Sequence, residues 1–185
     1  MSQKAGPGVH PLPGKHKGKR GAAAAVVTVV QRVSKASVTT EGKAAKIDSG
    51  LLILLGIGRE DDADDALALA EKVVHLRIFE DEKGKMNRSL LDIRGQALVV
   101  SQFTLLANLG RGRRPSFEAA APPERAEELY DRFVEKVRSL GVPTQTGVFG
   151  AFMNIELTNA GPVTLMVHSP DKGGQEKSRR KGHQP

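Results

Sequence analysis

Two hydroxyl side chains, Ser101 and Thr104, stand with Gln102 in the otherwise apolar stretch of residues 97–106. A serine or threonine nucleophile needs an activating base beside it. The sequence contains no G-x-S-x-G motif, and none of its five histidines lies in a pattern that pairs it with these hydroxyls. Backbone N–H groups at a strand end are an alternative, because they stabilise an oxyanion without any particular side chain. If the chain is an enzyme, we therefore expect backbone geometry and the substrate itself to supply most of the chemistry.

The Gly161-Pro162 pair is a second candidate for a functional stretch of backbone. It separates two strand-like stretches, residues 152–158 and 163–168. Glycine adopts backbone angles closed to other residues, and proline lacks an amide donor and populates the cis peptide bond. The pair predicts either an ordinary hairpin turn or a loop that presents carbonyl oxygens in a fixed arrangement. The pattern alone favours the turn.

The charged clusters and the lack of cysteine indicate neither a metal nor a cofactor. Without cysteine there are no disulfides and no thiolate zinc sites. The four aspartates between positions 61 and 65 are typical of a helix N-terminus, whose dipole favours acidic groups. Arg111, Arg113 and Arg114 predict a phosphate contact, because arginine suits bidentate phosphate geometry. An exposed polar loop is the alternative for these three arginines.

The net charge of +7 is concentrated at the two ends of the chain. Basic residues exceed acidic ones by five over residues 1–25 and by three over residues 169–185, which leaves −1 for the remainder. Such compositions are typical of disordered tails that attract a polyanion such as RNA. We therefore predict a basic tail over residues 1–24, a domain over residues 25–169 and a second basic tail over residues 170–185.

Hydropathy argues against a membrane protein. The longest apolar run covers residues 51–57, whereas a membrane helix needs about 20 residues. The N-terminal end lacks the apolar core of a signal peptide. Its basic, acid-free composition leaves a targeting segment open as an alternative to an RNA-binding tail. We expect a cytoplasmic protein, since the absence of cysteine fits a reducing compartment.

The periodicity of apolar residues predicts an α+β fold with two main helices. One helix is expected over residues 60–76, and the other over residues 122–140, from Pro122-Pro123 to a C-cap at Gly141. Strands are expected over residues 26–33, 36–40, 51–57, 77–79, 97–106, 144–149, 152–158 and 163–168. The continuous apolar run of residues 51–57 predicts a strand buried on both faces.

Two motifs resemble those of the D-aminoacyl-tRNA deacylase family. The first is Ser101-Gln102-Phe103-Thr104-Leu105, and the second is Asn159-Ala160-Gly161-Pro162-Val163-Thr164. Supporting stretches lie, in the expected order, at residues 30–33, 76–79, 84–87, 112–117 and 149–153. The likeness runs from about residue 26 to residue 168. An acidic residue often stands where this chain has Ala160, a departure that concerns loop packing and leaves the Gly-Pro pair intact.

The resemblance implies hydrolysis of the ester that joins a D-amino acid to the terminal adenosine of tRNA. It implies that glycyl-tRNA is also a substrate and that L-aminoacyl-tRNA is spared. The expected fold has mixed, rolled sheets packed with two main helices, and the expected assembly is a homodimer. Gly161 and Pro162, joined by a cis bond and preceded by Asn159, would enter the partner's pocket and leave no room for an L side chain.

The resemblance also assigns roles to residues of the pocket. The catalytic site would be lined by Ser101, Gln102, Phe103 and Thr104, with backbone amides near Phe103 and Thr104 holding the oxyanion. The terminal adenine would be held by Phe149, Gly150 and Met153. Either Thr104 or the 2′-hydroxyl of the tRNA end would be the key catalytic group, and the lack of a paired base favours the 2′-hydroxyl.

Two other functions remain as alternatives. One is that of a sister deacylase, which removes L-alanine mischarged on threonine tRNA. That branch differs at the phenylalanine of the first motif and uses a trans Gly-Pro bond, so Phe103 favours the D-specific activity. The other is a non-catalytic tRNA-binding module in which the basic tails do the binding.

Overall fold

The computed structural model describes residues 26–110 and 112–170. The two predicted basic tails lie outside these residues, apart from Pro170, and so does Arg111. The elements, in chain order, are β1 (Val27–Thr40), β2 (Lys43–Ile47), β3 (Gly50–Gly56), α1 (Ala63–Val74), β4 (Phe79–Glu80), β5 (Met86–Arg88), β6 (Gln96–Ser101), the 3₁₀ helix η1 (Phe103–Leu106), α2 (Pro123–Ser139), β7 (Thr144–Thr146) and β8 (Asn154–His168).

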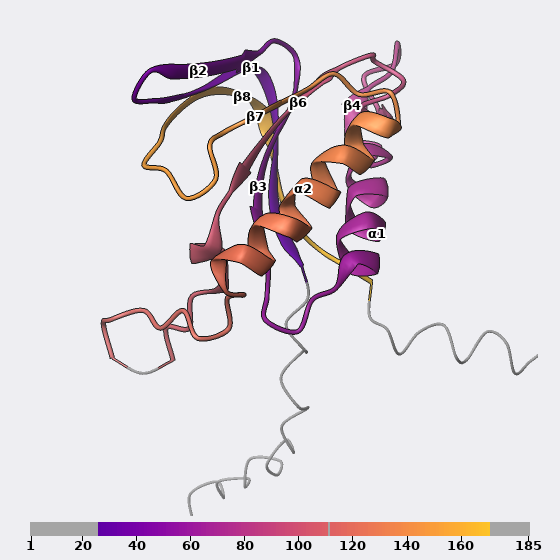
Figure 1. Cartoon of the computed structure of the whole chain (residues 1–185). Helices are drawn as coiled ribbons and strands as arrows, with labels where there is room; N and C mark the ends of the chain where they lie inside the picture. Colours follow the sequence, from indigo (N-terminus) through magenta and orange to yellow (C-terminus); the bar gives the residue numbers. More distant parts are fainter. Residues whose placement is uncertain (1–25, 111, 171–185) are drawn as a thin grey trace, which may run out of the picture.

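One mixed sheet organises the molecule, with strand order β2-β1-β3-β6-β7 and β8 paired to β1 (Figure 1). The pairs β3–β6 and β6–β7 are parallel, whereas β1 is antiparallel to each of its three neighbours. Along one edge, β1 pairs with β3 and then with β2, and β8 follows nearly the whole of its other edge. A separate small sheet pairs β4 with β5.

The two helices pack against one face of this sheet and close the main core (Figure 1). On α1, Leu69 and Val73 are fully buried, and on α2 Leu129, Phe133 and Val137 form the apolar stripe that faces the core. Burying such a stripe, rather than intrinsic helix propensity, supplies most of the stability of helices of this length.

The opposite face of the sheet covers a second, smaller core. Leu51 and Ile53 of β3 belong to the main core, whereas Leu52 between them belongs to the second cluster. This alternation follows from the two-residue period of a strand. The prediction that this apolar run is buried on both faces is therefore confirmed.

The α+β class and the two main helices are also confirmed, and the start of α1 has a clear local cause. The Asp62 carboxylate accepts a hydrogen bond from the Asp65 backbone N–H at 3.1 Å, and the Asp65 carboxylate accepts one from the Asp62 N–H at 3.1 Å. This reciprocal capping box satisfies two N–H groups that the helix leaves free, so the helix begins at Ala63. The acidic run thus marks a helix start, as its composition predicts.

Several predicted strand boundaries are wrong. Residues 26–33 and 36–40 form one long strand, β1, and β2 was not predicted. The strand expected over residues 144–149 ends at Thr146. The strand expected over residues 97–106 ends at Ser101, because the Gln102 carbonyl accepts a hydrogen bond from the Leu105 N–H at 3.2 Å and the chain turns into η1.

The hairpin turn that the local pattern favours at Gly161-Pro162 does not form, since β8 is one strand from Asn154 to His168. Both of its halves stay antiparallel to β1, with Asn159 opposite Val33 and Thr164 opposite Gln31. More residues lie between these two pairs on β8 than on β1, so the chain bulges around the Gly-Pro pair without leaving the ladder.

No helix within residues 26–110 and 112–170 has the length and the apolar character needed to cross a membrane.

Candidate active site

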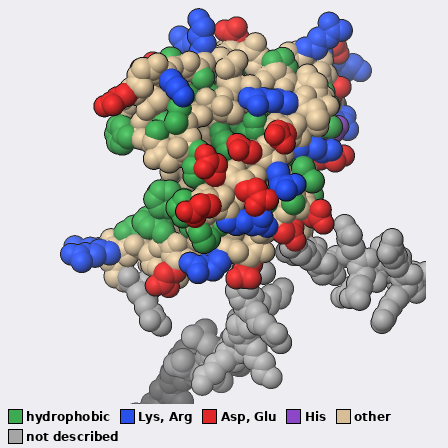
Figure 2. All heavy atoms as spheres, viewed as in Figure 1, with side chains coloured by type: hydrophobic (Ala, Val, Ile, Leu, Met, Phe, Trp, Pro, Cys, Tyr) green, Lys and Arg blue, Asp and Glu red, His purple; other side chains and the backbone are tan. Residues whose placement is uncertain are grey.

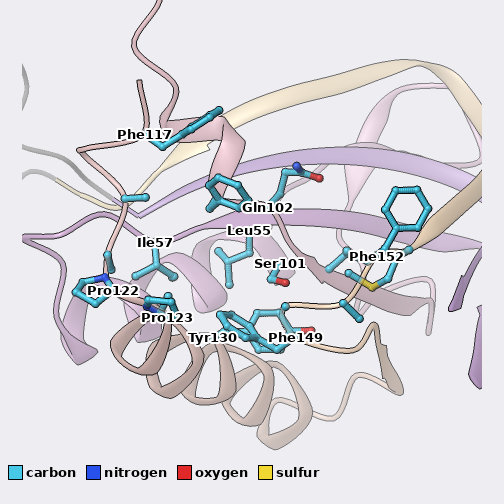
Figure 3. A pocket seen from close by; sticks show the side chains of 18 of the residues that line it. Leu55, Ile57, Ser101, Gln102, Phe117, Pro122, Pro123, Tyr130, Phe149 and Phe152 are labelled. Carbon is cyan, nitrogen blue, oxygen red and sulfur yellow. The ribbon is translucent and has the colours of Figure 1, made fainter. Parts of the chain in front are cut away.

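A cavity of about 720 Å³ opens where β6 ends and η1 begins (Figure 3). Its walls come from four separate parts of the chain: the end of β3, the turn after β6, the start of α2 with the segment before it, and the segment before β8. In Figure 2, the loop that follows η1 projects at the lower left, and apolar side chains gather directly above it, around the cavity. The lining residues that carry the argument are Ser101, Gln102, Phe103, Tyr130, Phe149 and Met153.

The first motif lies at the floor and rim of this cavity. Ser101 ends β6, and the Gln102 N–H donates to the Leu55 carbonyl at 2.7 Å, which fixes the turn. Beyond this turn, the Phe103 side chain is 57% exposed and packs edge-on against Phe117 at a centroid distance of 5.0 Å. Ser101, Gln102 and Phe103 therefore reach the cavity, as predicted, on a backbone that leaves the sheet at this point.

Thr104 differs from the other three residues of the predicted catalytic set, because it is not among the residues that line the cavity. Its hydroxyl accepts a hydrogen bond from the Gln102 side-chain amide. An amide neither takes up a proton at neutral pH nor activates a hydroxyl as a nucleophile. This contact gives Thr104 a structural partner rather than a base.

The three residues predicted to hold adenine come together on the opposite wall. Phe149, Gly150 and Met153 all line the cavity, and the Phe149 ring tilts against the Tyr130 ring at a centroid distance of 5.8 Å. Gly150 has a φ of +71°, a left-handed conformation that favours glycine. The wall is largely apolar and aromatic, which suits the flat face of a nucleobase.

The second motif does not line this cavity, and it stands on β8 instead. The peptide bond between Gly161 and Pro162 is cis, as the resemblance implies, and both residues are exposed. Asn159 holds the bulge from within, because its side-chain amide donates to the Arg32 carbonyl at 3.0 Å and to the Val163 carbonyl at 3.1 Å.

Arg32 is a second support of the bulge, and sequence patterns did not assign it a role. Its guanidinium donates to the Ala160 carbonyl at 2.6 Å and to the Ile78 carbonyl at 2.7 Å, and it lies 3.6 Å from the Glu80 carboxylate. The Arg32 side chain is only 12% exposed. The arginine therefore ties the segment beside Gly161 to the region of β4.

Sequence patterns also missed three aromatic members of the cavity: Phe117, Tyr130 and Phe152. Tyr130 lies on the buried side of α2 beside Leu129 and Phe133, so its spacing indicates a core residue. Phe117 and Phe152 fall within stretches that support the resemblance, which assigned them no role, and both lie in irregular segments of the structure. The predicted arginines Arg113 and Arg114 lie in the exposed loop between η1 and α2, away from the cavity lining.

Among the described residues that line the cavity, Arg59 and Tyr130 are the only ones with ionisable side chains. The Tyr130 hydroxyl donates to the Val99 carbonyl at 2.9 Å, and burial raises its pKa above the usual value, so it stays protonated. Neither side chain is a general base at neutral pH. In addition, no group of three or more His, Asp or Glu side chains within the described residues is arranged to hold a metal ion.

The titration of Tyr130 offers a direct test of this environment. The chain has one tyrosine and no tryptophan, so the near-ultraviolet absorbance of phenolate reports Tyr130 alone. We expect no phenolate signal in the native protein as the pH passes 10.0, the usual pKa of tyrosine, and a normal titration in denaturant. The unfolded state then releases a proton that the folded state keeps, so the free energy of unfolding falls as the pH rises above that value.

Tyr130→Phe is the matched variant for this measurement. It should remove the part of the pH dependence that Tyr130 causes. It should also lower the free energy of unfolding at neutral pH by about 1 kcal/mol, because the Val99 carbonyl then keeps only its bond from the Gly147 N–H. A native phenolate that titrates at the usual value would contradict the buried hydrogen bond.

Comparison with known proteins confirms the family that the sequence resembles. A sequence model described as D-Tyr-tRNA(Tyr) deacylase matches residues 29–168. The D-aminoacyl-tRNA deacylase of Fervidobacterium nodosum is 55% identical over 142 residues, which cover 76% of this chain and 95% of that protein. The enzyme of the same name from Thermomicrobium roseum is 57% identical over 147 residues, covering 79% of this chain and 96% of that protein.

The chain belongs to the D-Tyr-tRNA(Tyr) deacylase family.

Solved structures extend this assignment from sequence to fold. A c-Myc DNA unwinding element binding protein superposes with a TM-score of 0.73 at 41% identity, covering 78% of this chain and 99% of that one. A probable eukaryotic D-amino acid tRNA deacylase superposes with a TM-score of 0.69 at 18% identity over the same shares of the two chains, a likeness that concerns the fold alone. The part of this deacylase-family chain that matches the family model contains both the cavity and the Gly-Pro bulge.

Proposed function

We propose that this protein hydrolyses D-aminoacyl-tRNA, and glycyl-tRNA as well, to release the free amino acid and the tRNA. The observation that carries the proposal is the cavity of this chain, a member of the deacylase family, in which the first motif and an aromatic wall line the same space. We place this activity in the cytoplasm, as chiral proofreading during translation. Such a reaction requires a site that binds a nucleoside and an ester together, and a cavity of about 720 Å³ has the size of a small-molecule site.

In the proposed reaction, the terminal adenine lies against Phe149, Gly150 and Met153. The ester then faces Ser101 and Gln102, and the backbone amides near Phe103 and Thr104 hold the negative charge that develops on the carbonyl oxygen. Water attacks the ester carbon, the bond from this carbon to the 3′-oxygen breaks, and the 3′-oxygen leaves with a proton as a hydroxyl group.

The adenosine 2′-hydroxyl assists the water in this scheme. The support is the chemistry of the lining, in which Arg59 and Tyr130 are the ionisable groups among the described residues. Neither replaces a general base, so the group next to the ester on the substrate is the remaining candidate. In this scheme the protein positions the substrate, surrounds it with apolar side chains and donates backbone hydrogen bonds to the oxyanion.

Stereoselectivity is proposed to come from a second copy of the chain, which offers Gly161 and Pro162 to this cavity. Their carbonyls would face the alpha carbon of the substrate and exclude an L side chain. Two features support this role: the pair is exposed on β8, and Arg32 and Asn159 hold the backbone on either side of Gly161.

The free edge and the exposed face of β8 support a homodimer. Leu157, Leu165 and Met166 are exposed along this strand, with Met166 at 66%. Uncovered apolar side chains on a long edge strand are a liability that an interface removes. Sedimentation of the full chain should therefore give twice its mass of 19.8 kDa, and a monomer at the concentrations of the assay would contradict the shared site.

Arg111, Arg113 and Arg114, together with the basic tails, are proposed to contact tRNA phosphates outside the cavity. Arg113 and Arg114 are exposed, and such contacts add attraction without sequence preference.

The function is tested by measuring ester loss from two substrates in parallel. One is D-tyrosyl-tRNA, and the other is threonine tRNA mischarged with L-alanine. The proposal predicts rapid loss of the D-tyrosyl ester and loss of the L-alanyl ester at the uncatalysed rate. The reverse preference would establish the sister deacylase activity. Binding of both tRNAs without ester loss would leave only a tRNA-binding module.

A further inference from the structure

Phe152 is the most exposed large apolar side chain of the described residues, at 86%. It belongs to the lining of the candidate active site, yet Figure 3 shows its ring well apart from those of Phe149 and Tyr130. A core role does not account for a phenylalanine with this exposure. An exposed aromatic ring beside a nucleoside cavity is instead suited to stacking on a second base.

A second hollow lies on the other side of Phe152. Its volume is about 550 Å³, and it shares Ala151 and Phe152 with the active-site cavity. Thr39 and Asn154, which face each other at the last pair of the β1–β8 ladder, line it together with Thr40 and Glu41 from the turn after β1. The two hollows are therefore consecutive, with the Phe152 ring at their boundary.

The chemistry of the second hollow selects a base edge rather than a phosphate. Among the described residues, its lining has no lysine or arginine, and the Glu41 carboxylate repels an anion. The threonine hydroxyls and the Asn154 amide offer donors and acceptors. A carboxylate accepts a hydrogen bond from the exocyclic amino group of cytosine, and cytidine precedes the terminal adenosine in every mature tRNA.

We propose that the second hollow is a subsite for the nucleotide before the terminal adenosine, with its base stacked on Phe152 and its polar edge toward Thr40, Glu41 and Asn154. The inference rests on the proposed function, because it requires the terminal adenosine to occupy the first cavity. It gives the protein a contact with the single-stranded end of tRNA that free aminoacyl-adenosine lacks.

Three stable ligands test the subsite by calorimetric titration of the full chain. The first is 3′-amino-3′-deoxyadenosine carrying D-tyrosine through an amide. The second extends it at the 5′ side by a cytidine phosphate, and the third by the same phosphate and ribose without a base. The cytidine ligand should bind about tenfold more tightly than the baseless one, as expected for one base stacked on one ring.

Variants of the protein then test whether the affinity gained from cytidine depends on Phe152. Phe152→Ala should remove the advantage of the cytidine ligand over the baseless ligand, whereas Phe152→Trp should keep this advantage. Leu109→Ala is the matched control, because Leu109 is 66% exposed and lines neither hollow. It should leave all three affinities unchanged.

Three results would overturn the subsite: equal affinity of the cytidine and baseless ligands, an equal loss for all three ligands in Phe152→Ala, or dissociation of a dimer by that substitution. The last result would make Phe152 part of an interface between copies. Tight binding of the adenosine ligand without a gain from cytidine would overturn this inference alone. Failure of the adenosine ligand to bind would instead overturn the proposed function.

Discussion

Removal of the 2′-hydroxyl from the terminal adenosine is expected to slow the enzymatic hydrolysis of D-tyrosyl-tRNA by about 10²–10⁴-fold, the usual contribution of a positioned proton-transfer group. Thr104→Ala, in contrast, is expected to keep the rate within about tenfold of the original, because loss of a nucleophile would cost orders of magnitude more. The measurement is single-turnover ester loss with each substrate and each protein, corrected for the uncatalysed rate of the same ester.

These expectations follow from the hydrogen-bond partners of the Thr104 and Tyr130 hydroxyls. Thr104 contacts the Gln102 amide, which cannot take its proton, and Tyr130 is committed to the Val99 carbonyl. Thr146→Ala is the matched control, because it removes a threonine hydroxyl from β7, outside the cavity lining. If Thr104→Ala were inactive while the deoxy substrate reacted normally, the substrate-assisted scheme would be wrong and Thr104 would be the nucleophile.

Arg32→Ala is expected to lower D-tyrosyl-tRNA hydrolysis by about 10–100-fold and to raise the relative rate on L-tyrosyl-tRNA. The guanidinium bridges the Ala160 and Ile78 carbonyls at 2.6 and 2.7 Å. Hydrogen bonds from a charged donor contribute about 1.5–3 kcal/mol each. Without them, the backbone before Gly161 loses its support, so the proposed stereochemical filter is no longer held in place.

The ratio of D to L rates separates this role from a general loss of stability. Lys35→Ala is the control, since Lys35 is an exposed residue of the same strand and lies outside the bulge contacts. Arg32→Lys should behave like the alanine variant, because an ammonium group lacks the planar fork that reaches two carbonyls. A folded Arg32→Ala protein with an unchanged D to L ratio would show that the arginine does not position the filter.

Features of this fold that depend on local interactions could be predicted from the sequence, whereas features that depend on distant partners could not. The acidic run marks the start of α1 because capping is a local interaction between Asp62 and Asp65. Local rules favour a turn at the Gly-Pro pair, because they describe only the pair itself. Its real state is set by β1, which holds β8 in register on both sides of the bulge.

The candidate site shows the same division. The grouping of Phe149, Gly150 and Met153 with Ser101–Phe103 follows from the resemblance, and no spacing rule joins residues so far apart in the chain. The spacing of Tyr130 in α2 predicts a core residue, although its ring also lines the cavity. Arg32 lies in a β-branched strand, and its two carbonyl partners come from segments 46 and 128 residues away. Only the folded chain reveals such contacts.

Hydrolysis with exclusion of L substrates is tested by assaying the full chain on D-tyrosyl-tRNA and L-tyrosyl-tRNA prepared from the same tRNA. The two esters differ only in the configuration of one carbon, so the ratio of their rates measures stereochemical exclusion and nothing else. We expect rapid loss of the D ester and loss of the L ester at its uncatalysed rate. Equal hydrolysis of both esters, or no enzymatic loss of the D ester, would contradict it.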